Sequence, residues 1–233
     1  MTSPKTYHYV DPIPCTRWLQ YAAGACIICI LIILGYLVKG VYILYTHNYT
    51  SYVNLGYILE PAVSIERIGQ ITHIATILLV LIWTYRASAN MHAFQPNPDE
   101  PYYATPGETI LDYFVPLFNF IHPALVMREI WTNSLQLTAD RRANKRYLAF
   151  LWWWAFVAFA LLQLMAKREM EQHWMNTPEF AKKHIITLAL SYIPYLISAC
   201  LMIYLTRTIS QTQKAYAAAN NILSYADTPA RDP

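Results

Sequence analysis

The stretch AAGACIICILIILGYLV, residues 22–38, contains no charged residue and is apolar along its whole length. Together with its flanks it forms a predominantly apolar segment over residues 18–45, in which Lys39 is the one charged residue. The apolar core of a bilayer needs about 20 helical residues, so this segment is long enough to cross it. The stretch therefore predicts a membrane-spanning helix, and it sets the fold class for the rest of the chain.

The composition supports the same class. Of the 233 residues, 56% are hydrophobic and only 13% are charged, whereas about a quarter of a soluble domain is charged. The net charge of +3 is small and scattered, so we expect no nucleic-acid partner. Further apolar runs occur at residues 68–85, 147–166 and 185–206. We predict a single all-α integral membrane domain over residues 1–233, with four transmembrane helices in contact with membrane lipids.

The Lys and Arg residues predict the orientation of these helices. Eleven of them lie before the first span, between spans two and three, or after span four, against five in the other two loops. The positive-inside rule then places both termini in the cytoplasm. After the fourth span, residues 207–224 are predicted to continue as a cytoplasmic helix.

The segment YFVPLFNFIHPALVMREIW, residues 113–131, is apolar but interrupted by Pro116, Asn119, His122 and Pro123. Each proline frees a backbone carbonyl, and lipid cannot satisfy one. We therefore expect a re-entrant or interfacial pair of short helices over residues 108–135, on the cytoplasmic side, rather than a fifth span.

Three motifs resemble the domain-of-unknown-function 4328 family of bacterial multi-span membrane proteins. They are WTYRASAN (83–90), TPG (105–107) and the segment 113–131, whose residues fit F-V-P-x-x-N-x-x-x-P followed by E-x-W. The chain departs from the family pattern at His122 and at ETILD (108–112). The resemblance implies a multi-span protein of the bacterial inner membrane and implies no established activity.

The charged and amide residues of these motifs suggest a structural clasp. Arg86 and Asn90 lie four apart and share one helix face, and Glu129 is the predicted countercharge for Arg86. Asn119 is expected to bond carbonyls freed by the prolines, and Trp131 is expected to anchor the segment at headgroup level. The alternative is that the same residues line a pocket for a headgroup or another anion.

Other polar residues within the spans give weaker candidates. Lys39, Ser191 and Pro194 form a possible intramembrane polar site. Haem ligation would need facing histidines, for which the candidates are His47, His73 and His184. Cys26 and Cys29 form a C-x-x-C inside the first span, where packing is expected rather than redox chemistry or metal binding. We favour no cofactor and predict no metal site.

Three functions remain open at this point. The first is a non-catalytic subunit or scaffold that stabilises or assembles a larger inner-membrane complex, with protein partners or as a homo-oligomer. The second is a small transporter, channel or lipid- or anion-binding protein. The third is a haem-binding redox protein. The sequence contains no G-x-S-x-G, H-E-x-x-H or P-loop motif, so no enzyme class is indicated.

Overall fold

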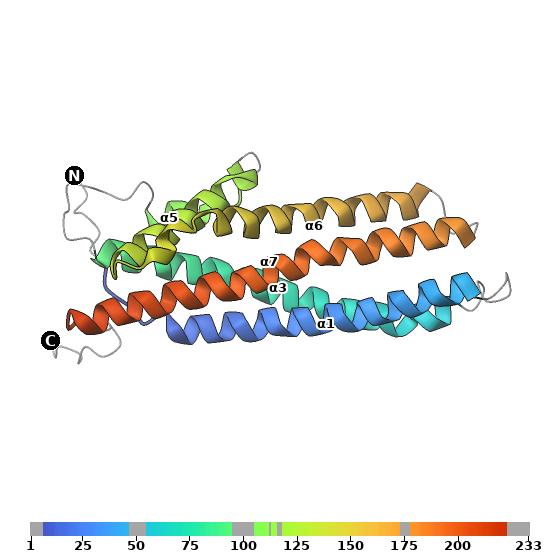
Figure 1. Ribbon diagram of the computed structural model, residues 1–233, viewed down its shortest axis with the longest axis horizontal. Helices are drawn as coiled ribbons and strands as arrows, with labels where there is room; N and C mark the ends of the chain where they lie inside the picture. Colours follow the sequence, from blue (N-terminus) through green and yellow to red (C-terminus); the bar gives the residue numbers. More distant parts are fainter. Residues whose placement is uncertain are drawn as a thin grey trace. The chain divides into compact units, whose positions relative to one another are not determined.

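The computed structural model describes residues 7–46, 55–94, 105–111, 113–115, 118–172 and 178–222, and these ranges contain helices and no strand. Figure 1 shows the four long helices, which are α1 (Ile13–Thr46), α3 (Leu55–Phe94), α6 (Tyr147–Gln172) and α7 (Pro178–Ala219). Between α3 and α6 lie four short ones: α4 (Pro106–Leu111), η1 (Phe118–Phe120), α5 (His122–Gln136) and η2 (Arg141–Asn144).

The four long helices confirm the predicted fold class, an all-α protein with four membrane-spanning helices. Each is long and apolar enough to cross a bilayer: Ile13–Thr46, Glu60–Phe94, Tyr147–Arg168 and Glu179–Ala219. A helix suits this environment because it satisfies its backbone hydrogen bonds internally. Large apolar side chains such as Ile28 and Ile71, 60% and 70% exposed, cover the outside of these helices, as contact with lipid requires. The chain is a multi-span membrane protein.

Two compact units divide the chain, and each long helix contributes one part to each of them. Unit 1 comprises residues 1–20, 77–151 and 201–233, and unit 2 comprises residues 21–76 and 152–200. The short helices α4, η1, α5 and η2 all belong to unit 1. The two units are described separately below.

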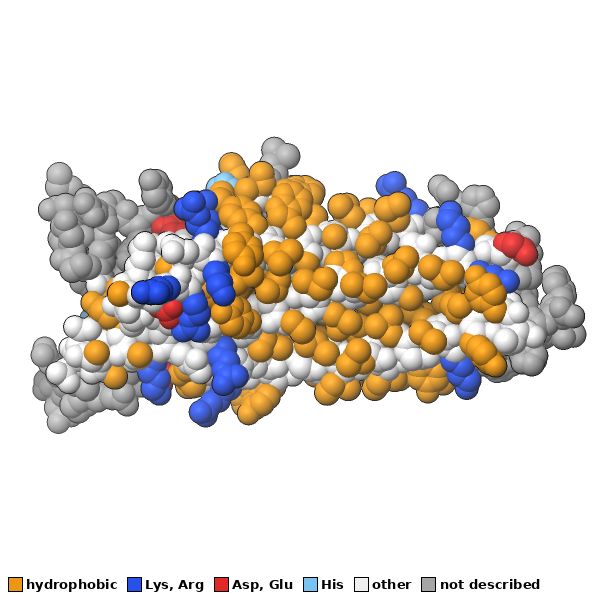
Figure 2. Space-filling model, viewed as in Figure 1, with side chains coloured by type: hydrophobic (Ala, Val, Ile, Leu, Met, Phe, Trp, Pro, Cys, Tyr) orange, Lys and Arg blue, Asp and Glu red, His pale blue; other side chains and the backbone are white. Residues whose placement is uncertain are grey.

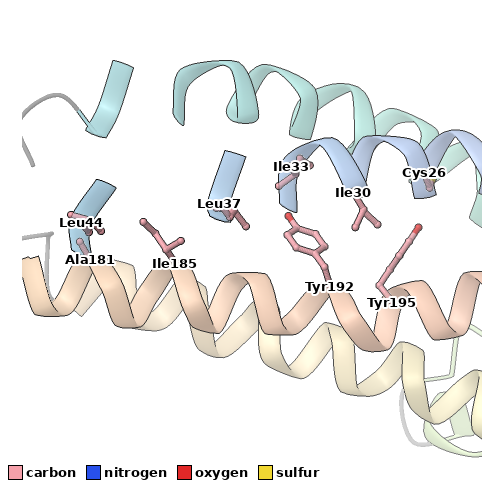
Figure 3. Packing of buried hydrophobic residues seen from close by; sticks show 9 residues of the cluster. All are labelled: Cys26, Ile30, Ile33, Leu37, Leu44, Ala181, Ile185, Tyr192 and Tyr195. Carbon is pink, nitrogen blue, oxygen red and sulfur yellow. The ribbon is translucent and has the colours of Figure 1, made fainter. Parts of the chain in front are cut away.

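Unit 2 has an apolar core between α1 and α7 (Figure 3). Residues Cys26, Ile30, Ile33, Leu37 and Leu44 repeat every three to seven positions along α1, which places them on one helix face. They meet Ala181, Ile185, Tyr192 and Tyr195 of α7. Cys26, one half of the C-x-x-C, is buried here as a free thiol, and its sulfur lies 3.3 Å from Thr72 Oγ1 of α3.

Unit 1 contains the segment predicted to be broken, residues 108–135. It consists of α4, a turn at residues 113–115, η1 and α5, while Pro116 lies outside the described residues. Pro123 occupies the first turn of α5, where a missing N–H costs nothing. One stripe of α5 is buried: Ala124, Met127, Ile130, Trp131, Ser134 and Leu135. The depth of this segment in the membrane stays a prediction.

Two helices of unit 1 end with a residue in the left-handed region. Ala139, with φ 52°, follows α5, and Asn221, with φ 54°, follows α7. In both cases two backbone hydrogen bonds close the end in the Schellman pattern: Asp140 N to Leu135 O and Ala139 N to Gln136 O after α5, and the corresponding pair after α7. Asparagine tolerates this conformation, but alanine carries a steric cost.

Candidate functional site

Asn90, in the last part of α3, holds the N-terminal segment of unit 1. Its side chain is fully buried. Its Oδ1 accepts the Val10 N–H at 2.9 Å, and its Nδ2 donates to the Val10 carbonyl at 2.9 Å. The same Nδ2 donates to Gln213 Oε1 of α7 at 3.0 Å. Asn90 therefore pairs with Val10 as a neighbouring strand would, and it joins this segment to two helices.

Gln213 extends the hydrogen bonds from α7 to α5. Its Nε2 donates to the Ala87 carbonyl at 3.1 Å and to Ser134 Oγ of α5 at 3.0 Å. Ser134 in turn donates to Met91 Sδ at 3.2 Å. Gln213 and Ser134 are both fully buried, so their hydrogen bonds replace water that neither side chain can reach.

Trp83 is the centre of a second group of polar side chains, about two turns earlier on α3 than Asn90. Its Nε1 lies 3.0 Å from both Thr16 Oγ1 of α1 and Ser210 Oγ of α7. The two hydroxyl oxygens are 2.6 Å apart, and Thr16 also donates to the Pro12 carbonyl at 2.9 Å. Because a hydroxyl has one proton, Ser210 donates to Thr16, and Trp83 donates to both oxygens.

The buried side chains just described share one feature: each has its hydrogen-bonding partners inside unit 1. We refer to them as the polar cluster, made up of Thr16, Trp83, Asn90, Ser134, Ser210 and Gln213. In a low-dielectric interior such satisfied networks are rigid and specify one packing arrangement. The cluster therefore fixes α1, α3, α5 and α7 to one another within this unit.

Trp131 has a different place from the one predicted for it. Instead of lying at the lipid surface it is fully buried, with its ring 5.9 Å from that of Tyr204. Its Nε1 donates to the Arg142 carbonyl at 3.2 Å, which ties α5 to η2. Position 131 lies on the buried face of α5, so the Trp131 ring points into unit 1.

Asp140 stabilises the turn between α5 and η2. Its carboxylate accepts the Arg142 backbone N–H at 2.8 Å and pairs with the Arg142 guanidinium at 2.6 Å. These hydrogen bonds from Arg142, side chain first and backbone second, hold the pKa of Asp140 below its usual value.

An open groove of about 500 Å³ lies along α3 in unit 1. Ile82, Arg86 and Ala89 line it from α3, and Tyr7 and Val10 line it from the N-terminal segment. Arg86 is half-buried in this groove. Among the described residues it forms no ion pair.

Glu129 lies in different surroundings from Arg86. It lines a cavity of about 10 Å³ together with Ser88, Met91 and Asn133, which is too small for a ligand larger than water. Within the described ranges no ion pair joins Arg86 to Glu129, so the structure does not assemble the charge pair of the predicted clasp. The reason is helix geometry: Arg86 and Ser88 are two residues apart and point to nearly opposite sides of α3.

Asn119, the remaining clasp residue, belongs to η1. Its backbone N–H donates to the Val115 carbonyl at 2.8 Å. Its side-chain Oδ1 is buried and has no hydrogen-bond partner among the described residues. Of the five predicted clasp residues, Asn90 and Trp131 thus join elements of unit 1, but through partners that charge and spacing do not suggest.

The residues of the predicted intramembrane polar site lie in unit 2 and do not form one site. Lys39 is exposed on α1, whereas Ser191 is fully buried on α7. Ser191 accepts a hydrogen bond from Gln163 Nε2 at 3.0 Å and donates to the Leu188 carbonyl at 2.6 Å. Pro194 stands half-buried within the continuous helix α7.

The haem candidates are also dispersed. His73 Nδ1 lies 2.8 Å from the Tyr195 hydroxyl, and the histidine ring stacks on Phe156. His184 precedes Tyr195 on α7 by about 16 Å along the axis, at 1.5 Å per residue. The two histidines are therefore not brought together, and His47 lies outside the described residues. In the described part of the chain no three His, Cys, Asp or Glu side chains are grouped to hold a metal.

The fold and these contacts define a class, that of all-helical, multi-span membrane proteins built on a four-helix framework. A family model described as Domain of unknown function (DUF4328) matches residues 55–213, which is more than half of the chain. The chain belongs to this family. The comparison of this chain with curated proteins and with solved structures found no match.

Proposed function

We propose that the protein is a non-catalytic membrane subunit that stabilises or assembles a larger complex. The observation that carries this proposal is the use of the motif side chains. Asn90, Trp83 and Trp131 form hydrogen bonds that join helices, and each is fully buried. Buried hydrogen bonds of this kind make the helix frame rigid. A rigid frame keeps its surface in one arrangement, which suits a protein that binds other proteins.

The hydroxyl groups of α7 support the same proposal. Thr206 and Thr212 are buried and donate to carbonyls four residues earlier, at 2.8 and 2.9 Å. Hydroxyls that bond to their own helix in this way have an acceptor without water, which favours packing over a hydrated path. The apolar core of unit 2 (Figure 3) likewise favours a subunit over a transporter or channel.

The apolar outer surface offers the contact area that such a role needs. Ile71 and Ile74 of α3 are 70% and 59% exposed, and Val38 of α1 is 65% exposed. Gly35, also exposed on α1, has no atom near the position of an added Cβ. Within a membrane, helices associate by close packing of such surfaces rather than by a hydrophobic driving force.

Gentle isolation of the native protein tests this proposal. The tagged chain is extracted in a mild detergent and analysed by size-exclusion chromatography and by mass spectrometry. A tagged, unrelated protein with four spans is the control. We expect partners in stoichiometric amounts that the control does not retain. A photo-crosslinking side chain at Ile71 should capture the same partner, whereas one at buried Ile33 should not. Recovery of the chain alone would refute the subunit proposal.

A further inference from the structure

The groove beside Arg86 has a polarity gradient along one stripe of α3. Ile82, Arg86 and Ala89 follow one another at intervals of four and three residues, so they lie on one face of the helix. Leu81 and Ile82 form the end of the groove toward the middle of the span Glu60–Phe94. Arg86 lies one turn nearer to the end of that span, so the apolar wall is closer to the middle of the span than the charge is.

The polar atoms that face the groove suit an anion. Asn90 also lines it, but its amide is used by Val10 and Gln213, which leaves Arg86 as the strong donor. Burial, then Tyr85 and Glu108, raise the pKa of Tyr7, so this hydroxyl stays protonated and can donate. The Glu108 carboxylate itself accepts the Thr105 N–H at 2.7 Å at the start of α4.

We propose that this groove binds one anionic phospholipid, with its phosphate on Arg86 and an acyl chain along Leu81 and Ile82. Guanidinium groups bind phosphate through paired, charge-assisted hydrogen bonds. The volume of about 500 Å³ is in the range of organic ligand sites. A free phosphate would leave the apolar wall unused, whereas a lipid matches both ends of the groove.

The basic side chains of unit 1 favour anionic lipid over neutral lipid. Figure 2 shows Lys and Arg side chains close together around η2 and the last part of α7, both of which belong to unit 1. The exposed basic residues of this unit include Arg17, Arg141, Arg142, Lys145, Arg146, Arg207 and Lys214. Basic groups near a membrane surface concentrate anionic lipid. Unlike these exposed residues, Arg86 is half-buried and stands beside an acyl-sized wall.

Lipid titration of the purified, delipidated full chain tests the site. The protein in a neutral detergent is titrated with dioleoylphosphatidylglycerol and with dioleoylphosphatidylcholine, and bound lipid is counted by native mass spectrometry. We expect one phosphatidylglycerol per chain, bound roughly tenfold more tightly than phosphatidylcholine. Arg86→Gln should remove this preference, and Arg86→Lys should keep part of it. The matched control, Arg207→Gln, removes one exposed charge that does not line the groove and should keep the preference for phosphatidylglycerol.

Two further measurements separate the groove from general surface charge. Ile82→Trp fills the apolar end without changing charge and should weaken phosphatidylglycerol binding several-fold. Glycerol 3-phosphate, which lacks acyl chains, should compete poorly. Equal losses in Arg86→Gln and Arg207→Gln would overturn the proposal, as would full competition by glycerol 3-phosphate. If Arg86→Gln does not fold, unchanged lipid binding by Ile82→Trp overturns it.

This lipid site goes beyond the proposed subunit role and does not depend on it. Lipid binding is measured on the isolated chain, whereas the subunit proposal is measured by what co-purifies from the membrane. A chain that binds phosphatidylglycerol at Arg86 but retains no partner would support the first and refute the second.

Discussion

At the scale of single residues, each buried amide of unit 1 forms several hydrogen bonds that hold the unit together. Asn90 satisfies both backbone groups of Val10 and also the Gln213 side chain. A buried polar group that loses its partner costs about 1–3 kcal/mol. Replacing a buried amide that has three partners should therefore lower the stability of the protein more than replacing an amide at the surface.

Asn90→Ala should lower the free energy of unfolding by about 2–4 kcal/mol, because it leaves Val10 and Gln213 with unmet hydrogen bonds. The control is Asn220→Ala at the exposed end of α7, where the lost bond to the Tyr216 carbonyl can be replaced by water. Unfolding in detergent, followed by circular dichroism, measures both. Equal stability of the two variants would contradict the central role of Asn90.

The sequence identifies Asn90 and Trp131 through their motifs, but it does not identify their partners. Gln213 and Ser134 look like ordinary polar positions of two helices that lie 79 residues apart in sequence. Thr16 and Ser210 are 194 residues apart and meet only after folding. Arg86 and Glu129 were paired by opposite charge alone, and charge carries no information about which side of a helix faces a neighbour.

At the scale of elements, hydropathy predicts the four long helices, but each predicted span is shorter than the helix that contains it. The predicted span 185–206 is the middle of α7, which runs from Pro178 to Ala219, and the helix predicted over residues 207–224 is its continuation. Hydropathy falls after Thr206, yet the helix continues because buried positions such as Ile209, Gln213 and Ala217 still pack inside unit 1. The mean hydropathy of a sequence window cannot show that a polar residue such as Gln213 packs inside a helix bundle.

The end of α5 gives a prediction about backbone strain. Ala139→Gly should stabilise the protein by about 0.5–1 kcal/mol, because glycine adopts a positive φ without the steric cost of a Cβ. Ala218→Gly, at an exposed helical position of α7, should instead destabilise it by about 1 kcal/mol. Unfolding midpoints of the two variants are compared under the same detergent conditions. A loss of stability in both would show that Ala139 is not strained.

At the scale of the whole molecule, the four membrane-spanning helices restrict where the ends of the chain can lie. An even number of crossings leaves both described ends on one side of the membrane. The basic side chains of unit 1, in η2 and the last part of α7, fit the cytoplasmic side by the positive-inside rule.

Reporter fusions test this orientation. A fluorescent protein fused after Ile222 should be active, and alkaline phosphatase at the same position should be inactive, because the first folds in the cytoplasm and the second only outside it. Fusions after Thr46, at the end of α1, should give the reverse pattern. Active phosphatase after Ile222 would refute the cytoplasmic placement of unit 1.

The contact between Asn90 and Gln213 also has a consequence for biosynthesis. The two residues are separated by 123 positions, so Asn90 leaves the ribosome long before its partner exists. The Val10 segment, made earlier still, has its partner Asn90 once α3 has been translated, and only the hydrogen bond from Asn90 to Gln213 waits for the last part of α7. Unit 1 therefore combines the first, the middle and the last parts of the chain, and it is complete only when the last part of α7 has been made. A nascent chain arrested before Gln213 would leave the Asn90 amide, the Ala87 carbonyl and the Ser134 hydroxyl without that partner, and that makes it a natural substrate for membrane quality-control proteases.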